Sequence, residues 1–272
     1  MKTICIINLK GGVAKTISAA NIAHVLACVH NKTVLLVDND KQGNVSKMFG
    51  LHSYDFPTIS ELLTDRDANI HEIITPTQYK NLDIIPSNMT LLRANMKIML
   101  DTRRPQQTRL RDALKTVAGD YDYCVIDCAP DLNISTINAL VAAKDVLIPI
   151  KIDKFAFDGL AELEEQINNT REDLNPVLIM RGCFVTSYQN NEVNRQGEAW
   201  LREQSGYPIF KTHIRRTEKV DESTFANKPI LEHSPRCGAA RDYIALVNEL
   251  LESVSDSDTK AKKGGRRYGG KV

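Results

Sequence analysis

A glycine-rich loop with a lysine at each end constrains this chain more than any other feature of its sequence. The apolar stretch Thr3–Asn8 predicts a buried strand, the stretch Lys15–His30 predicts a helix, and Lys-Gly-Gly-Val-Ala-Lys-Thr lies between them at positions 10–16. In such a junction, consecutive backbone N–H groups and the positive end of the helix face one point, where they bind an anion. We therefore expect a nucleotide site in which Lys15 contacts the β- and γ-phosphates and the Thr16 hydroxyl holds Mg²⁺.

The loop is a variant of the common phosphate-binding pattern G-x-x-x-x-G-K-[ST], because Leu9 and Ala14 occupy the positions of its two glycines. It fits K-G-G-x-x-K-[ST], which begins with an additional lysine, Lys10. For this segment alone, the alternative is a strand–turn–helix junction that contains Gly-Gly and Lys-Thr by chance. The residues expected to contact the nucleotide are Lys10, Gly11, Gly12, Val13, Ala14, Lys15, Thr16 and Ile17.

Carboxylates follow two further predicted strands. Asp38 and Asp40 come after Thr33–Val37, and Asp127 comes after Tyr121–Ile126. The carboxyl ends of parallel strands lie over the nucleotide crevice of an α/β sheet. Asp127 has the position of a Walker B aspartate, which holds Mg²⁺. A single aspartate at a strand end is often only a helix cap or turn former, but the three features occur together in the expected order.

Short apolar stretches alternate with longer amphipathic ones along the chain. This alternation predicts a doubly wound, mostly parallel α/β sheet with helices on both faces. Together with the phosphate loop, such a sheet resembles the architecture of a P-loop NTPase. The remaining strand candidates are Leu82–Pro86, Asp145–Ile150, Val177–Thr186 and Pro208–Lys211. The remaining helix candidates are Thr90–Gly119, Ile134–Ala143, Gly159–Asp173, Asn194–Ser205 and Gly238–Val254.

Composition predicts one folded domain and one tail. The 272 residues carry a net charge of +1, and residues 1–254 suit a single α/β domain. Residues 255–272 hold six lysines and arginines, four glycines and almost no apolar side chain, so we expect a disordered basic tail. No signal peptide or membrane-spanning stretch is apparent, and the scattered cysteines form no CxxC pair, which favours a cytoplasmic location.

These motifs resemble those of the deviant Walker A ATPases, the ParA/MinD group, and most closely the small ParA-type partition ATPases. The resemblance extends from about residue 2 to about residue 254. It is carried by KGGVAKT at 10–16, VLLVDNDKQGN at 34–44, LDIIPSN at 82–88, YDYCVIDCAP at 121–130, DGLAELEEQI at 158–167, and the long stretch 214–250.

The resemblance implies an ATPase that uses ATP and Mg²⁺ and forms a homodimer with the nucleotides sandwiched between its subunits. Lys10 would reach the phosphates bound by the other subunit, and Asp40 would orient the attacking water. Thr16, Asp38 and Asp127 would lie near Mg²⁺, although Asp38 could instead be a structural cap. Residues 130–133 would sense the γ-phosphate. The implied catalytic residues are Lys10, Lys15 and Asp40.

Two positions depart from the family pattern. Ala14 replaces the glycine that usually precedes the loop lysine, and its methyl group could crowd the phosphates. Lys41 replaces the proline that usually follows Asp40, which predicts a loose cation beside the water-positioning carboxylate. We expect a functional but slow ATPase that a partner protein stimulates.

Other branches of the family fit the sequence less well. The tail has no apolar face, so it predicts no membrane-binding helix of the MinD type. Cys128 has no suitable partner for an iron–sulfur cluster, and the C-terminal CxxC of the cluster carriers is absent. The tail has one tyrosine, Tyr268, instead of the tyrosine cluster of the kinase members. No helix-turn-helix pattern precedes the phosphate loop.

The resemblance also implies that the ATP-bound dimer binds double-stranded DNA without sequence preference. A solvated basic face is the alternative for each candidate contact, and for Arg241 a structural ion pair is favoured over DNA. The candidate DNA-binding residues are Arg195, Arg202, Lys211, Arg215, Arg216, Lys219, Lys262, Lys263, Arg266 and Arg267.

The function that this resemblance implies is nucleoid-associated DNA partition for a plasmid, mobile element or chromosome. A ParB-like, centromere-binding partner would stimulate hydrolysis and release the DNA. One alternative is a switch of the same type that positions a protein cargo on the nucleoid. A metabolic ATPase of the same fold is the other alternative, and it would need a substrate pocket and no affinity for DNA.

Overall fold

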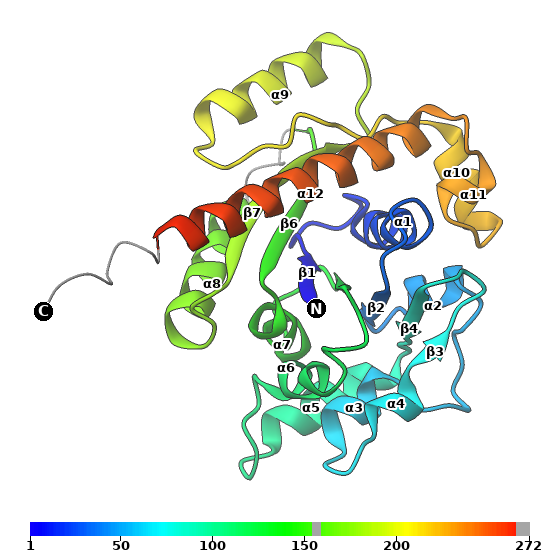
Figure 1. Ribbon diagram of the computed structural model, residues 1–272, viewed down its shortest axis with the longest axis vertical. Coiled ribbons are helices and arrows are strands. Elements are labelled where there is room, and N and C mark those ends of the chain that lie inside the picture. Colours follow the sequence, from blue (N-terminus) through cyan, green and yellow to red (C-terminus); the bar gives the residue numbers. More distant parts are fainter. Residues whose placement is uncertain (154–158, 265–272) are drawn as a thin grey trace, which may run out of the picture.

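The computed structural model describes residues 1–153 and 159–264. Its core is a seven-stranded sheet with the order β3-β4-β2-β5-β1-β6-β7 (Figure 1). All neighbouring strands are parallel except β3 and β4. The strands are β1 (Lys2–Ile6), β2 (Val34–Asn39), β3 (Thr75–Pro76), β4 (Leu82–Ile85), β5 (Tyr123–Cys128), β6 (Asp145–Lys151) and β7 (Ile179–Thr186).

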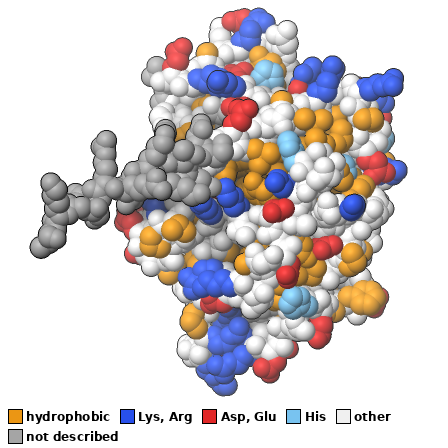
Figure 2. All heavy atoms as spheres, viewed as in Figure 1, with side chains coloured by type: hydrophobic (Ala, Val, Ile, Leu, Met, Phe, Trp, Pro, Cys, Tyr) orange, Lys and Arg blue, Asp and Glu red, His pale blue; other side chains and the backbone are white. Residues whose placement is uncertain are grey.

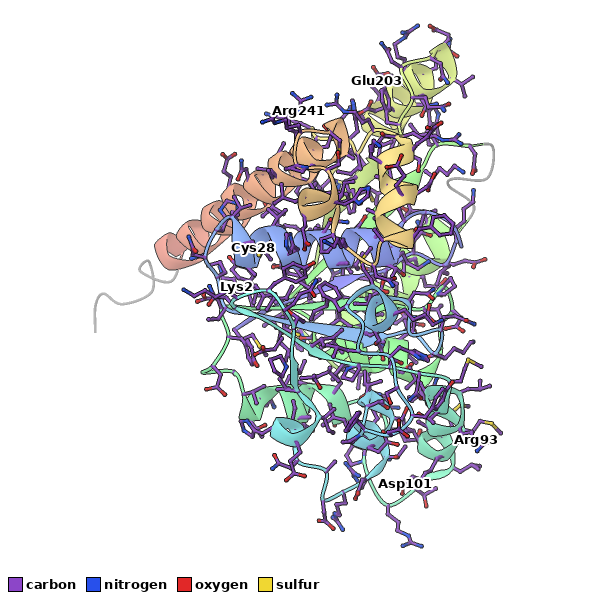
Figure 3. The ribbon with its side chains drawn as sticks, turned by 90° about the vertical axis from the view of Figure 1, so that its right-hand side faces the viewer. Lys2, Cys28, Arg93, Asp101, Glu203 and Arg241 are labelled. Carbon is purple, nitrogen blue, oxygen red and sulfur yellow. The ribbon has the colours of Figure 1, made fainter. Side chains whose placement is uncertain are left out.

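Helices cover both faces of this sheet, which confirms the predicted doubly wound fold. They are α1 (Lys15–Cys28), α2 (Asn44–Met48), α3 (Ile59–Thr64), α4 (Ile70–Ile73), α5 (Thr90–Leu100), α6 (Arg109–Thr116), α7 (Ile134–Ala142), α8 (Leu160–Asp173), α9 (Glu192–Gln204), α10 (Glu218–Phe225), α11 (Ile230–His233) and α12 (Gly238–Gly264). Figure 3 shows the sheet lying between two helical layers.

Two apolar clusters hold these layers together. Successive side chains of a strand point to opposite faces of a sheet. In β1 and the residue after it, Ile4 and Ile6 pack with α1 and α12, whereas Cys5 and Ile7 pack with α3, α5, α6, α7 and α8. The parallel strands are therefore apolar on both faces, which is why they read as continuous apolar runs in the sequence.

The topology brings the carboxyl ends of three central strands to one edge. Strand β5 lies between β1 and β2, and Asp38 of β2 is directly opposite Asp127 of β5 in the register. The loop that leaves β1 therefore emerges beside both aspartates. This arrangement positions the candidate site.

Several elements differ from the sequence prediction. The single helix predicted over residues 90–119 is two helices, α5 and α6, because Pro105 lies between them and a proline disfavours helix in the residue before it. The predicted strand at 208–211 is reduced to an isolated bridge between Ile209 and Cys183. The sequence predicted a disordered tail from residue 255 onward, whereas helix α12 continues to Gly264. Residues 265–272 lie outside the described part.

Both edges of the sheet are protected. At one edge, β3 is only two residues long, and its second residue, Pro76, pairs with β4 in antiparallel register. At the other edge, bridges to Ile209 and Arg215 cover parts of β7 and the residues that follow it.

In the described residues, no helix is long and apolar enough to cross a membrane.

Candidate nucleotide site

The phosphate loop connects β1 to α1 through two residues with left-handed backbone. Gly12 has a φ of 73° and Ala14 a φ of 63°. Ala14 is also the residue that precedes the first turn of α1, and no side chain caps that helix end. The first backbone N–H groups of α1 are thus available to an anion, as in other phosphate-binding helix ends.

The alanine at position 14 carries a backbone cost that a glycine would not. A left-handed conformation costs an L-residue about 1–2 kcal/mol, because the Cβ approaches the following carbonyl oxygen. The structure therefore adds strain at Ala14 to the phosphate crowding that the sequence suggested. Alanine in place of the usual glycine at position 14 therefore makes the folded loop less stable, even before a nucleotide binds.

We expect Ala14→Gly to stabilise the folded loop and to tighten ATP binding a few-fold. Relief of the left-handed strain exceeds the extra chain entropy that glycine loses on folding, about 0.5–1 kcal/mol, and leaves a net gain of about 1 kcal/mol or less. Thermal unfolding with and without ATP would measure both effects. The control is Ala245→Gly, at an exposed position inside α12, which should destabilise by about 1 kcal/mol. Equal destabilisation by both variants would contradict the strain argument.

The two loop lysines adopt different positions. Lys15 is buried, and its Nζ donates a hydrogen bond to the carbonyl oxygen of Lys10 at 2.8 Å. Burial lowers the pKa of the Lys15 ammonium, while Asp127 and Asp40 oppose that shift. The Lys10 side chain forms an ion pair with Asp153, which follows β6. Lys15 is thus held inside the loop, whereas Lys10 points across it toward β6.

Asp127 is the most unusual group in the site. It is fully buried, and neither carboxylate oxygen has a hydrogen bond of ordinary geometry within the described residues. Burial, followed by the nearby charge of Asp38, raises the pKa of this carboxyl well above its usual range, and Thr16 counteracts the shift. A buried charge without partners is costly unless a cation neutralises it. Asp127 beside Thr16 therefore fits a Mg²⁺ site.

The site contains no dense set of metal-binding side chains. The described residues include no group of three or more histidines, cysteines or acidic residues arranged to hold an ion. Mg²⁺ commonly keeps several waters and uses one or two protein ligands together with substrate phosphates. A sparse set made of one carboxylate and one hydroxyl agrees with that chemistry.

Asp38 is occupied by structural hydrogen bonds. One of its oxygens accepts the N–H and the hydroxyl of Ser46 at 2.8 and 2.7 Å, and the other accepts the N–H of Asp40 at 3.2 Å. Ser46 Oγ in turn accepts the N–H of Ser87. Burial raises the pKa of Asp38 to about 6. This geometry favours the capping role that the sequence left open, with Asp38 fixing the loop that carries Asp40.

Asp40 and Lys41 face the cleft beneath the loop. One carboxylate oxygen of Asp40 accepts the N–H of Gln42 at 2.9 Å. Lys41 was expected to be loose, and that expectation is wrong, because its Nζ pairs with Asp131 at 3.3 Å. The cleft has a volume of about 360 Å³, and its walls include Gly11, Lys15, Thr16, Asp40, Lys41, Pro130 and Asp131. The structure thus brings most of the predicted phosphate-contacting residues and Asp40 to one hollow, whereas Asp38 and Asp127 are buried and do not line it.

A second hollow of about 260 Å³ adjoins the first, and Ala14 lies in the walls of both. The Thr186 hydroxyl at its base donates to the carbonyl oxygen of Val13 at 3.1 Å and so joins β7 to the loop. Sequence patterns missed this hollow, because its residues come from distant loops without a shared motif. They include Lys151, Thr186, Ser187, Asn194, Ile214, Arg215 and Arg216.

Most described candidate DNA contacts form ion pairs within the chain. The pairs are Arg195 with Glu192, Arg202 with Glu198, Lys219 with Glu222, and Arg215 with Asp242. Arg216 and Lys211 are exposed and have no ion pair among the described residues. Lys262 and Lys263 lie in α12, but their side chains are outside the described part, as are Arg266 and Arg267. Arg216 and Lys211 are therefore the described cations most available to a phosphate backbone.

Comparison with known proteins places the chain in a family. A family model described as an AAA domain matches residues 1–180. The chromosome partitioning protein ParA of Myxococcus xanthus is 35% identical over 257 residues, which cover 92% of this chain and 88% of that protein. The sporulation initiation inhibitor protein Soj of Bacillus subtilis is 34% identical over 255 residues, covering 92% of this chain and 98% of that protein.

A solved structure extends this similarity to the fold. The cobyrinic acid a,c-diamide synthase of Mycobacterium smegmatis, crystallised with ADP and magnesium, superposes with a TM-score of 0.82 at 26% identity. The superposition covers 94% of this chain and 96% of that one. The variant phosphate loop of this chain and the aspartates beside it indicate the same family as the relatives, which match nearly the whole chain. The chain belongs to the ParA-type partition ATPases of the ParA/MinD family.

Proposed function

We propose that this chain binds MgATP in the cleft beneath the phosphate loop and uses its hydrolysis to partition DNA. The buried, unpartnered carboxylate of Asp127 beside Thr16 and Lys15 is the observation that carries the nucleotide part of the proposal. Buried in this way, the carboxyl carries its charge at neutral pH only when a cation lies near it, because burial otherwise favours the protonated form. The similar structure that was crystallised with ADP and magnesium supports the same assignment.

Each residue of the cleft then has a role. The backbone of residues 10–17 surrounds the phosphates, and Lys15 lies where it neutralises their charge. Thr16 and Asp127 would hold Mg²⁺, which would supply positive charge near the transferred phosphoryl group. Asp40, positioned by the hydrogen bonds around Asp38, orients the attacking water.

The second hollow fits the nucleoside. It opens at Ala14, directly beside the phosphate site, so a nucleotide whose phosphates lie under the loop extends its base toward Ile214 and Thr186. The hollow has both apolar and hydrogen-bonding walls, as small-molecule sites usually do. Arg215 and Arg216 also line this hollow, so a base bound there would lie next to these cations.

DNA binding, dimerisation and partner stimulation complete the proposal. ATP draws two copies together across the cleft, Lys10 exchanges Asp153 for the phosphates of the partner copy, and exposed cations such as Arg216 and Lys211 contact DNA phosphates. A ParB-like protein that binds a centromere-like site accelerates hydrolysis and releases the DNA. Similarity to ParA and Soj over 92% of the chain supports this cycle. The protein would then act in the cytoplasm, on the nucleoid.

Two alternatives keep the same nucleotide chemistry. A positioning switch would use the cycle to place a protein cargo on the nucleoid. A metabolic enzyme is suggested by the name of the solved relative, a cobyrinic acid a,c-diamide synthase. The metabolic alternative requires no affinity for DNA, and so the DNA measurement separates it from partition.

We expect salt-sensitive, ATP-dependent binding to random-sequence duplex DNA, weakened by Arg216→Ala. Each lost phosphate contact lowers the slope of log affinity against log salt by about one. The matched control is Arg195→Ala, because Arg195 is also exposed but is already paired with Glu192. Fluorescence anisotropy with ATP, ADP and no nucleotide would measure the effect. Failure to bind in any nucleotide state would exclude the DNA step and favour the metabolic alternative.

A further inference from the structure

The outward face of α5 carries a regular stripe of exposed apolar side chains. Met89 precedes the helix, and Leu92, Met96 and Met99 follow at spacings of three or four residues, which place them on one face. Their exposed fractions are 44%, 45%, 62% and 64%, and that of Leu100 beside them is 80%. We call these five residues the α5 stripe. Single exposed apolar residues are common, but an aligned row of them marks an interaction site.

The stripe is not a consequence of poor packing. The opposite face of α5 is buried through Leu91, Ala94 and Ile98, and this face packs against α3 and α7. The Thr90 hydroxyl bonds to Ser60 of α3 at 2.7 Å and fixes the start of the helix. The fold thus orients α5 firmly and leaves the stripe facing outward.

Cations border the stripe on one side. Arg93 and Lys97 are exposed and one turn apart, and neither forms an ion pair in the described part of the chain. Figure 3 shows Arg93 pointing away from the body of the molecule. At the end of the helix, a hollow of about 660 Å³ is lined by four cations, Arg66, Lys97, Arg103 and Arg104. Figure 2 shows lysine and arginine side chains gathered at the lower end of the molecule, where the α5–α6 loop lies in Figure 1.

The acidic residue of this hollow does not neutralise it. Asp101 pairs with Arg109 at 2.8 Å and also accepts the N–H of Arg103. Nη1 of Arg104 is buried and has no hydrogen-bond partner within residues 1–153 and 159–264. Exposed guanidinium groups such as that of Arg103 favour a carboxylate, which can accept two of their hydrogen bonds.

We propose that the α5 stripe docks an amphipathic helix of a protein partner, with acidic residues along one flank of the partner helix. The helical spacing of the stripe fits the apolar face of a second helix. Methionine side chains adapt to such a face. Arg93, Lys97 and the basic hollow select carboxylates on the flank. This surface is separate from the nucleotide cleft, so the proposal does not rest on the ATPase cycle.

The charge pattern distinguishes this occupant from a second copy of the chain. A two-fold contact places the same surface against itself. If the two α5 helices met antiparallel, Arg93 and Lys97 of both copies would lie on the same side and repel, and if they met parallel these cations would gain no acidic partner from the stripe of the other copy. An acidic helix gains attraction at the same positions.

The test measures binding of the full chain to two labelled synthetic helical peptides of about 18 residues. Both peptides carry the same leucine stripe, one with glutamates along a flank and the other with lysines. We expect the acidic peptide to bind at least about tenfold more tightly than the basic one. Met96→Glu should weaken that binding at least about tenfold, and Arg93→Glu combined with Lys97→Glu should reverse the preference between the peptides.

A matched control separates the stripe from exposed apolar residues in general. Val177 lies outside α5, and its exposed fraction of 65% is similar to the 62% of Met96. Val177→Glu should therefore leave peptide affinity unchanged. Unchanged ATPase activity in all variants would show that the fold and the nucleotide site are intact. The proposal is overturned by equal affinity for both peptides, or by loss of binding in Val177→Glu. Met96-dependent binding to phosphatidylglycerol vesicles instead of the peptide, or Met96-dependent self-association, would assign the stripe to a membrane or a second copy.

Discussion

Lys15→Ala will lower kcat/KM for ATP hydrolysis by at least about a hundredfold. The Lys15 ammonium is buried inside the phosphate loop and is held by the carbonyl oxygen of Lys10. It is therefore oriented before the nucleotide arrives, and preorganised charge of this kind contributes about 10²–10³ in rate. Alanine removes this charge and leaves no side chain at position 15 that can reach the phosphates.

Phosphate release and calorimetric titration with ATP would measure this loss. The control is Lys47→Ala, because Lys47 is exposed on α2 and its side chain makes, within the described residues, only a long hydrogen bond to Asn44. Its replacement should leave both readouts within about twofold, as surface substitutions usually do. A Lys15→Ala protein that retains more than a tenth of the normal turnover would show that this lysine is not the phosphate ligand.

Asp127→Asn should change stability and activity in opposite directions. Without Mg²⁺, the variant should resist unfolding by about 1–3 kcal/mol more than the unmodified chain, because it removes a carboxyl that the folded state must either keep protonated or bury as a charge. With Mg²⁺ and ATP, hydrolysis should fall at least about a hundredfold, because the amide binds the cation poorly. Few substitutions at a structural position produce this combination.

The same carboxylates give the protein a predictable pH dependence. Burial raises the pKa of Asp38 to about 6 and shifts the pKa of Asp127 in the same direction. The unfolded chain releases these protons near pH 3.9, whereas the folded chain retains them to higher pH. The free energy of unfolding therefore falls as pH rises from about 4 to about 6, and this contribution stays lost above that range.

Urea unfolding without Mg²⁺ at about pH 4.5 and about pH 7.5 would measure this dependence. The Asp127→Asn protein should show a smaller decrease between the two conditions than the unmodified chain. Addition of Mg²⁺ and nucleotide should stabilise only the unmodified chain by a large margin. If Asp127→Asn destabilises the protein at neutral pH without Mg²⁺, Asp127 serves the fold and not a cation.

The phosphate loop and the central strands could be predicted because their signals are local. Residues 10–16 need only a preceding strand and a following helix to form an anion site, and both were visible as apolar patterns. The capping box at Thr58 and Glu61 was also visible, as Thr-x-x-Glu, and it marks the start of α3, which the prediction omitted. Pro105 gave an equally local reason to divide the helix predicted over residues 90–119.

The pairing of charged side chains could not be predicted, because it depends on distant segments. Arg215 reaches Asp242 across 27 positions, and Lys41 reaches Asp131 across 90. The sequence shows which residues are charged, but only the fold determines which of them form ion pairs. The looseness expected of Lys41 was therefore wrong, and the ion pair of Arg215 became visible only in the structure.

The protected edges of the sheet bear on how copies of this protein can associate. An open strand edge is a template for another strand, and contacts that form by strand addition tend to grow into aggregates. Here Pro76 offers no N–H at one edge, and Ile209 and Arg215 cover part of the other. Association must then proceed through side chains at surfaces of limited extent. Such assemblies close at a defined size and can be taken apart again, which the reversible DNA cycle proposed above would require.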